Sequence, residues 1–219
     1  MAPSFSPRPV LRSFFVASML ALWATLSLSQ QTGFVRIKVR DCVQLELPQD
    51  WTIRSPAERQ VVEELAKSLV PNEPMPVTEL AASWPGIPAA IARVSFDPLV
   101  SPVTQAEFTA QVERDRELAV SNLGKWWVAN SVSLWAGLAK AGIREVGRAQ
   151  VGIEEIGGKM AYVVHYRRTS ASDSSKTMNV ALYHVPMGSQ RVNITLSYIE
   201  GNETAQDAIA RVKSSIAIE

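Results

Sequence analysis

Cysteine and histidine are scarce in this chain. Among 219 residues there is one cysteine, Cys42, and there are two histidines, His165 and His184. A single cysteine excludes a disulfide within the chain, so the folded body must rest on its own hydrophobic core. We expect Cys42, which precedes the alternating segment VQLEL, to be buried as a small apolar residue rather than to act in redox or nucleophilic chemistry.

Common catalytic and cofactor motifs are missing as well. The sequence has no glycine-rich nucleotide loop, no His-Glu-x-x-His, no Cys-x-x-Cys and no Gly-x-Ser-x-Gly. Serines are plentiful, but no serine, histidine and carboxylate stand out as a hydrolase triad. We therefore predict no enzymatic activity, no cofactor and no metal site. A hydrolase that uses a serine near His165 or His184 is kept as a third hypothesis.

The two histidines fall on strands that we predict to be neighbours. If the segment TSASDSSK closes their hairpin symmetrically, His165 faces Val180 and His184 faces Ala161. Both side chains would then share one face of the sheet, about 13 Å apart at about 3.3 Å per residue. That distance is too large for one metal ion, so we expect two separate histidines.

Residues 1–29 have the pattern of a secretory signal peptide. Arg8 and Arg12 precede a short apolar run, no acidic residue is present, and small residues lead up to Gln30. The apolar run is shorter than the roughly 20 residues that span a bilayer comfortably. We predict cleavage before Gln30 and export to the periplasm or beyond the cell. An uncleaved signal anchor that retains the same domain is the alternative.

Composition indicates one globular domain without a strong charge. With 47% hydrophobic and 20% charged residues, the chain differs from disordered sequences. Cleavage would leave 190 residues with 20 basic and 21 acidic side chains. That length can build a core, and that balance gives no attraction to nucleic acid or bulk anionic lipid. We predict a protein partner, no nucleic acid and at most a weak contact with a membrane surface.

The strand pattern predicts an antiparallel sheet. Apolar residues alternate with polar ones at 43–47, and 89–98 also reads as a strand. Four further strand-like runs fill residues 143–198, separated by Gly157-Gly158, TSASDSSK and PMGSQ. Short breaks of this kind indicate hairpins in a meander.

Helices are predicted where capping signals open amphipathic segments. Capping boxes begin at Ser55 and Thr104, a third helix closes the chain, and a short helical turn is expected at TELAAS. The predicted buried positions are Val61, Val62, Leu65, Leu69, Phe108, Val112, Ala119, Leu123, Ala205, Ile209, Val212 and Ile216. Because such helices must cover the apolar faces of the sheet, we predict a single α+β domain.

Several segments resemble a known family. In order they are VQLELPQDW, IGGKMAYVVHYRR, MNVALYHVPMGSQRVNITLSY and the closing SSIAIE. Together they resemble the PsbP-like family, which includes photosystem II extrinsic proteins and bacterial exported DcrB-type proteins. The resemblance covers residues 43–219 and leaves 30–42 as an N-terminal extension. It implies a PsbP-like α/β/α sandwich and a non-catalytic accessory, assembly or chaperone-like role. The metal-linked positions of plant members have no match here.

Residues 124–142, GKWWVANSVSLWAGLAKAG, hold three of the six tryptophans and are predicted as a helical insert. At about 100° per residue, Trp127 and Trp135 lie on an apolar arc that only Ser131 interrupts, while Trp126 projects from the polar face. The rest of the arc is Val128, Val132, Leu134, Leu138 and Ala139, and the other side holds Asn130, Ser133, Gly137 and Lys140.

Three interpretations of this helix remain open: a core helix, a membrane-surface helix and a docking face. Our leading hypothesis is a non-enzymatic exported accessory protein that binds or chaperones another protein. The candidate partner-binding residues are Trp126, Trp127 and Trp135, because tryptophan is favoured at interface hot spots. The alternative is a small-molecule or lipid-binding protein with a pocket between the tryptophan-rich helix and the sheet.

Overall fold

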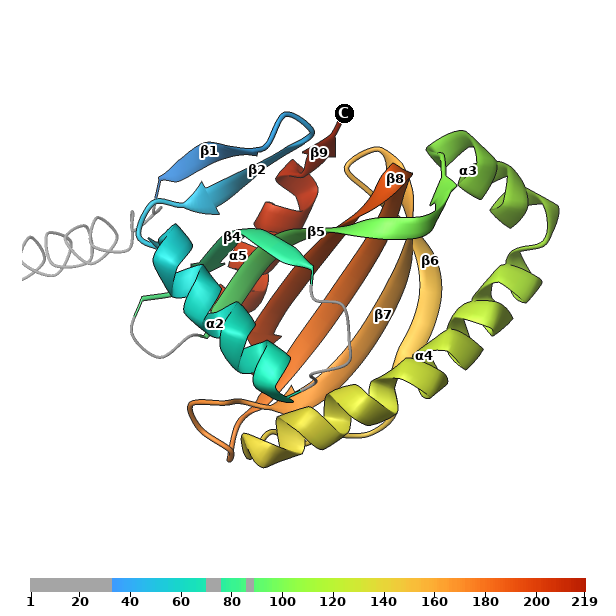
Figure 1. The fold of residues 1–219 in the computed structure, drawn as a ribbon. Coiled ribbons are helices and arrows are strands. Elements are labelled where there is room, and N and C mark those ends of the chain that lie inside the picture. Colours follow the sequence, from blue (N-terminus) through green and yellow to red (C-terminus); the bar gives the residue numbers. More distant parts are fainter. Residues whose placement is uncertain (1–32, 70–75, 86–88) are drawn as a thin grey trace, which may run out of the picture. The chain divides into compact units, whose positions relative to one another are not determined.

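A six-stranded antiparallel sheet forms the centre of the fold (Figure 1), with the strand order β3-β4-β5-β8-β7-β6. The computed structural model describes residues 33–69, 76–85 and 89–219, so the predicted signal peptide lies outside the described residues. The strands are β3 (Thr52–Ile53), β4 (Val77–Ser83), β5 (Ala90–Val103), β6 (Gln150–Ile156), β7 (Lys159–Thr169) and β8 (Thr177–Ile199).

Strand β8 is long because it folds back on itself. Its first half pairs with β7 and its second half with β5. The amide of Glu200 donates a hydrogen bond to the carbonyl of Thr177, 2.9 Å away, so the two ends of β8 meet. The reversal lies near Gly188, which has a φ of 71°. The predicted meander is confirmed, including the turns at Gly157-Gly158 and PMGSQ.

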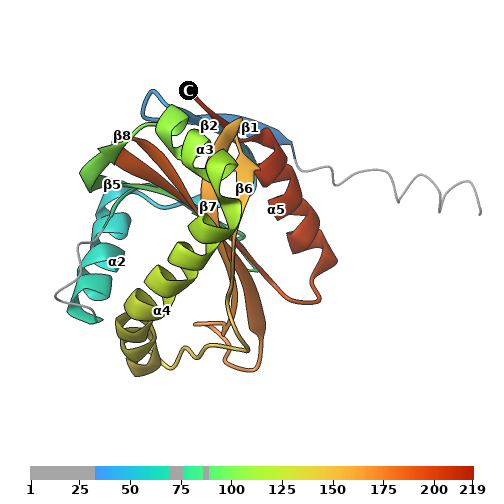
Figure 2. The ribbon, with the colours of Figure 1, turned by 90° about the vertical axis from the view of Figure 1, so that its right-hand side faces the viewer.

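One face of the large sheet is covered by a small sheet and by α5 (Glu203–Ser215), as Figure 2 shows. The small sheet has the order β1 (Phe34–Val39), β2 (Val43–Pro48) and β9 (Ala217–Ile218). Strand β1 pairs with β2 along its whole length, so regular structure begins within the segment 30–42. The alternation predicted for β2 is confirmed, because Val43, Leu45 and Leu47 are fully buried.

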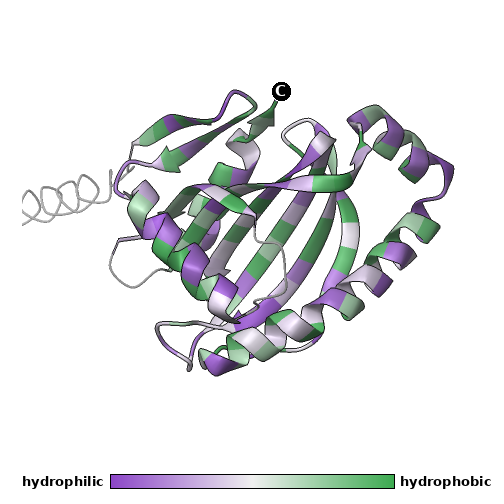
Figure 3. Ribbon diagram, viewed as in Figure 1, coloured by the Kyte–Doolittle hydropathy of each residue, from purple (hydrophilic) through white to green (hydrophobic). Residues whose placement is uncertain are grey.

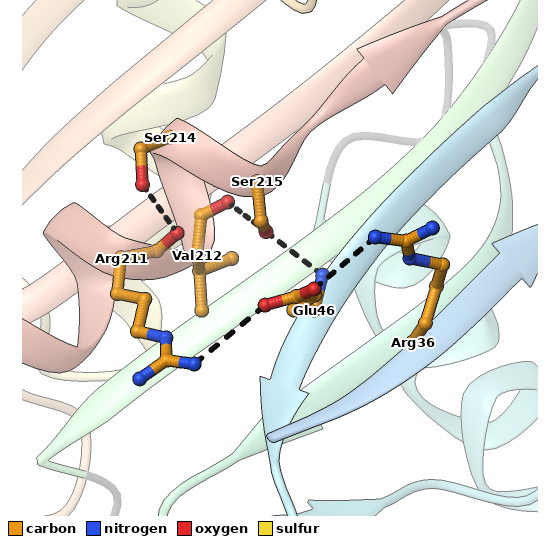
Figure 4. A network of polar contacts seen from close by, with 6 residues as sticks. All are labelled: Arg36, Glu46, Arg211, Val212, Ser214 and Ser215. Carbon is orange, nitrogen blue, oxygen red and sulfur yellow. Dashed lines mark hydrogen bonds and ion pairs between the residues drawn. The ribbon is translucent and has the colours of Figure 1, made fainter.

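Glu46 on β2 holds the last turn of α5 against the small sheet (Figure 4). The Glu46 amide donates to Ser215 Oγ at 2.8 Å, and its carboxylate lies 3.3 Å from Arg36 Nη2 and 3.8 Å from Arg211 Nη2. Exposed ion pairs of this kind each contribute little, at most about 1 kcal/mol. The buried side of α5, which includes Ala205, Ile209 and Val212 as predicted, supplies most of the packing.

The other face is covered by α2 (Pro56–Leu69), α3 (Gln105–Arg114) and α4 (Arg116–Lys140). The capping box at Thr104 is confirmed, as is the pairing of Ser55 with Glu58 at the start of α2. Helix α4 begins at Arg116, where Asp115 caps it, and runs on through the tryptophans. The tryptophan-rich segment is therefore part of one long helix. No helix in the described ranges is both long and apolar enough to cross a membrane.

Two local predictions are wrong. TELAAS forms strand β4, which pairs with β5, rather than a helical turn. Helix α2 exposes Val61, Val62 and Leu65, because its polar side faces β4: Arg59 Nε donates to the Thr78 carbonyl, and the Thr78 amide donates to Glu63. The side chain of Leu69 lies outside the described part.

Along the strands of the large sheet, hydrophobic and hydrophilic residues alternate as expected (Figure 3).

Gly157 lies where the large sheet comes close to strand β9 of the small sheet. It has a φ of 60° in the β6–β7 turn, and a Cβ there would lie 2.8 Å from Ile218 Cγ1 and 3.1 Å from the Ile218 backbone nitrogen. Gly158 has a φ of 75° and open space around it.

We expect Gly158→Ala to lower the free energy of unfolding by about 1–2 kcal/mol, because alanine is strained in the left-handed backbone. Gly157→Ala should cost about 1–3 kcal/mol more, for overpacking. Urea unfolding measures both, and equal losses would contradict the close approach.

Candidate functional site

A cavity of about 280 Å³ lies between α4 and the face of the large sheet that α4 covers. Its walls are mainly apolar and aromatic, and they bring together one turn of α4, the middle of β7 and both halves of β8. We call it the His184 cavity. Its lining residues are Asn122, Leu123, Trp126, Tyr162, His184 and Arg191.

The register of β7 on β8 turns His184 toward this cavity. His184 pairs with Tyr162, and His165 pairs with Ala181, each one residue away from the partner expected from symmetric closure. Because a shift of one residue reverses the face of every side chain, the histidines lie on opposite faces of the sheet. The prediction that they share a face is therefore wrong.

His184 is buried, with 6% of its surface exposed, and is fixed by a chain of hydrogen bonds. Its Nδ1 contacts Asn193 Oδ1, and Asn193 Nδ2 donates to Asp97 Oδ1 at 3.2 Å. A carboxylate only accepts hydrogen bonds, so Asn193 must turn its NH₂ toward Asp97 and its carbonyl toward His184. The proton of the neutral imidazole therefore sits on Nδ1, and Nε2 carries a free lone pair.

The Nε2 atom of His184 is buried without a hydrogen-bond partner among the described residues. The ring of Trp126 stands edge-on to the imidazole, with ring centroids 5.6 Å apart and an interplanar angle of 82°. A buried polar atom that stays unpaired costs about 1–3 kcal/mol. Because His184 lines the cavity, this unpaired acceptor is a candidate binding point for a molecule that donates a hydrogen bond.

Arg191 places a positive charge near the imidazole. It forms a bidentate ion pair with Asp97, with Nε and Nη2 at 3.2 and 2.6 Å from the two carboxylate oxygens. Burial first, and then the charge of Arg191, lower the pKa of His184 to about 4. His184 is therefore neutral at pH 7, and its Nε2 is an acceptor.

A larger hollow, of about 650 Å³, lies between α3 and the β6–β7 hairpin, and two of its polar side chains are engaged by backbone carbonyls. Gln105 Nε2 donates to the carbonyls of Met160 and Pro186, and Arg116 Nη2 donates to the carbonyl of Ile153. The unpaired acceptor belongs to His184, which lines the smaller cavity, so we take the smaller one as the candidate site.

The opposite face of the sheet carries a separate polar cluster around Glu154. His165 Nε2 lies 2.7 Å from Glu154 Oε1, while Lys213 Nζ and the Tyr183 hydroxyl donate to Oε2 at 3.0 and 3.2 Å. Burial pushes the pKa of Glu154 up, but hydrogen bonds from His165 and Lys213 outweigh burial and lower it. These groups satisfy one another, and they attach α5 to β6 and β7. Within the described ranges no three metal-ligating side chains cluster.

The three tryptophans occupy different surroundings. Trp127 is 8% exposed and stacks on Tyr166 at 5.6 Å, and Trp135 meets the same tyrosine edge-on at 5.5 Å. Trp126 is 38% exposed and covers the His184 cavity. Only Trp126 is therefore both accessible and next to a cavity. The partner-binding role of the three stays a prediction.

The predicted buried arc of the tryptophan-rich helix is wrong in part. Val128 and Val132, placed inward from the sequence, are both 67% exposed, whereas Ser131 and Gly137 are buried. The buried line follows every fourth residue, through Ala119, Leu123, Trp127 and Ser131. The helix crosses the strands of the sheet at an angle (Figure 1). Because this angle depends on the sheet beneath the helix, the sequence of the helix alone does not predict it.

Sequence reasoning missed Asp97, Arg191 and Asn193, which position His184. One signal was available: Arg191 and Asn193 are two apart in a strand and so share a face. The partner that orients them, Asp97, arrives from β5, and nothing local to β8 indicates it.

No family model and no curated protein matches the sequence. Among solved structures, cyanobacterial PsbP (CyanoP) from Synechocystis sp. PCC 6803 is 13% identical, with a TM-score of 0.45 over 86% of this chain and 94% of that one. LpqN, involved in cell envelope biogenesis of Mycobacterium tuberculosis, is 12% identical, with a TM-score of 0.41 over 85% and 90%. A protein from Bacteroides thetaiotaomicron is 7% identical, with a TM-score of 0.38 over 81% and 45%.

CyanoP belongs to the family that the sequence resembles. At these identities and TM-scores the likeness concerns the arrangement of helices and strands alone. The description of the cavity therefore rests on the residues of this chain.

The low pKa of His184 predicts a pH dependence of stability. As pH falls below the ordinary value of 6.5, the unfolded chain binds a proton at His184, while the folded chain does not until about pH 4. The stability that this histidine contributes above pH 6.5 is therefore lost between pH 6.5 and 4, by about 3 kcal/mol. Urea unfolding of wild type and His184→Asn measures the loss, since asparagine can still donate to Asn193.

In that comparison the free energy of unfolding of wild type should fall more steeply with acid than that of His184→Asn. The variant His165→Asn is the matched control, because His165 is half-exposed, and it should keep the steep segment. Parallel pH profiles for wild type and His184→Asn would show that the buried imidazole is not held neutral.

Proposed function

We propose that this chain is an exported accessory protein that acts by binding, and that its ligand is a small, mainly apolar molecule held in the His184 cavity. One observation carries the proposal: the Nε2 atom of His184 is buried and lacks a partner among the described residues, and His184 lines the cavity. Ligand cavities are typically apolar, with a few placed polar groups that fix orientation. The cavity beneath Trp126 has that composition.

Export is supported by the sequence of residues 1–29, with its basic start, short apolar run and small residues before Gln30. A body with one cysteine also needs no oxidative pairing when it folds outside the cytoplasm, because its core supplies the stability.

The make-up of the cavity favours binding over hydrolysis. Its six lining residues include no serine, threonine or cysteine that would act as a nucleophile. The Nδ1 of His184 contacts an amide rather than a carboxylate. The hydrolase hypothesis would need a nucleophile delivered to this wall from elsewhere in the chain.

Binding of small molecules is tested with a panel of one- and two-ring compounds: toluene, phenol, anisole, indole and 1-methylindole. We expect isothermal titration calorimetry to detect binding of at least one to wild type. Asn122→Trp, at the exposed edge of the cavity, should abolish binding by blocking entry. Ser133→Trp, at another exposed position of the same helix and outside the lining of the cavity, should bind as wild type does. No binding by any compound, or unchanged binding in Asn122→Trp, would contradict the proposal.

A protein partner is the second candidate, supported by exposed aliphatic side chains. Val128 and Val132 on α4 and Val61 and Leu65 on α2 are each at least 60% exposed. Exposed apolar groups on neighbouring turns of a helix are typical of docking surfaces.

The second candidate predicts that crosslinking in intact cells recovers a defined partner. The double variant Val128→Asp/Val132→Asp should lose that partner while its melting temperature stays within about 2 °C of wild type, because exposed positions contribute little to stability. Recovery of the same proteins from wild type and the double variant would exclude this surface.

A further inference from the structure

We propose that the ligand of the His184 cavity is a neutral aromatic molecule of one or two rings that carries a single hydroxyl or N–H and donates it to His184 Nε2. The proposal rests on the proposed function, because it assigns a chemical class to that same site. It follows from the direction of the hydrogen bonds, the charges around the imidazole and the shape of the walls.

The direction of the hydrogen bonds is set by Asp97. Its carboxylate accepts from Asn193 Nδ2, which leaves the Asn193 carbonyl to accept the Nδ1 proton of His184. The free atom at the far end, Nε2, can then only accept. A ligand without a donor, such as an ether, a ketone or a hydrocarbon, would leave Nε2 unpaired, at the free-energy cost of a buried polar atom.

Charged donors and anions both fit the cavity badly. The Arg191 guanidinium lies about 6.0 Å from the centre of the Trp126 ring, so an ammonium ion in the cavity would meet a like charge. The same guanidinium holds both oxygens of Asp97, so its charge is already balanced by a carboxylate. An anion would bring lone pairs toward the lone pair of Nε2. A neutral donor satisfies the acceptor without either penalty.

The walls favour a flat ring. Trp126 stands edge-on to His184, and Tyr162 is held in place by an edge contact with Phe108 at 4.6 Å between ring centroids. Aromatic pairs in such arrangements contribute beyond the area that they bury. An apolar cavity of about 150 Å³ accommodates benzene. A volume of about 280 Å³ therefore suits one or two rings rather than a lipid chain or a peptide.

The test compares matched probes that differ only in the donor. Phenol is paired with anisole, and indole with 1-methylindole, in calorimetric titrations of the full folded protein at pH 7. We expect wild type to bind phenol and indole about tenfold to a hundredfold more tightly than their methylated partners, because methylation leaves Nε2 unpaired. In His184→Asn the ratio within each pair should fall to about one, while His165→Asn should keep the wild-type ratio.

The outcomes separate this inference from the proposed function. Equal binding of both members of each pair, lost in Asn122→Trp, would overturn the donor requirement and leave the binding function standing. A preference for donors that persists in His184→Asn would assign recognition to another group and overturn the inference. No binding of any probe would overturn both. The comparison within wild type stands even if His184→Asn fails to fold.

Discussion

The pairing of Tyr162 with His184 across β7 and β8 determines which side chains meet at each face of the large sheet. With this register, Tyr183 points toward Glu154 and Lys213 of α5, and His184 points toward α4. A shift of one residue would exchange the faces, burying the imidazole against α5 and the small sheet. Register is set by the hydrophobic pattern and the turns, and β8 pairs with β7 along one half and with β5 along the other, so the two pairings constrain each other. The cavity therefore depends on an arrangement of the whole sheet.

Within that arrangement, one partly buried carboxylate, Asp97, sets the direction of the hydrogen bonds in the site. Asp97 comes from β5, and its lone pairs orient Asn193, which in turn fixes the proton of His184. Arg191 balances the charge of Asp97 and helps to keep the imidazole neutral. Because the amide of Asn193 lies between the carboxylate and the imidazole, it orients the imidazole without placing a full negative charge next to it. The result is a neutral acceptor next to Trp126, a group suited to recognition of a donor.

Features that depend on neighbouring residues could be predicted from the sequence. The alternation in β2, the capping box at Thr104 and the Gly157-Gly158 turn each follow from a few adjacent side chains, and each is confirmed. Features that depend on distant elements could not be predicted from the sequence. Helix α2 turns polar residues toward β4, and the buried line of α4 reflects the angle at which it crosses the sheet. The cavity joins Trp126, His184 and Arg191 only after the register is set. The sequence therefore suggested a pocket beneath the helix as one alternative, but it did not predict the polar residues of that pocket.

The most direct test of the proposed site is the protonation state of the His184 ring. Nitrogen-15 NMR of protein labelled at its two histidines distinguishes a protonated ring nitrogen from one with a free lone pair. At pH 7 we expect His184 to be neutral, with the proton on Nδ1 and a free lone pair on Nε2. A proton on Nε2, or a doubly protonated ring, would contradict the direction of the Asp97–Asn193–His184 chain and the acceptor on which the site depends.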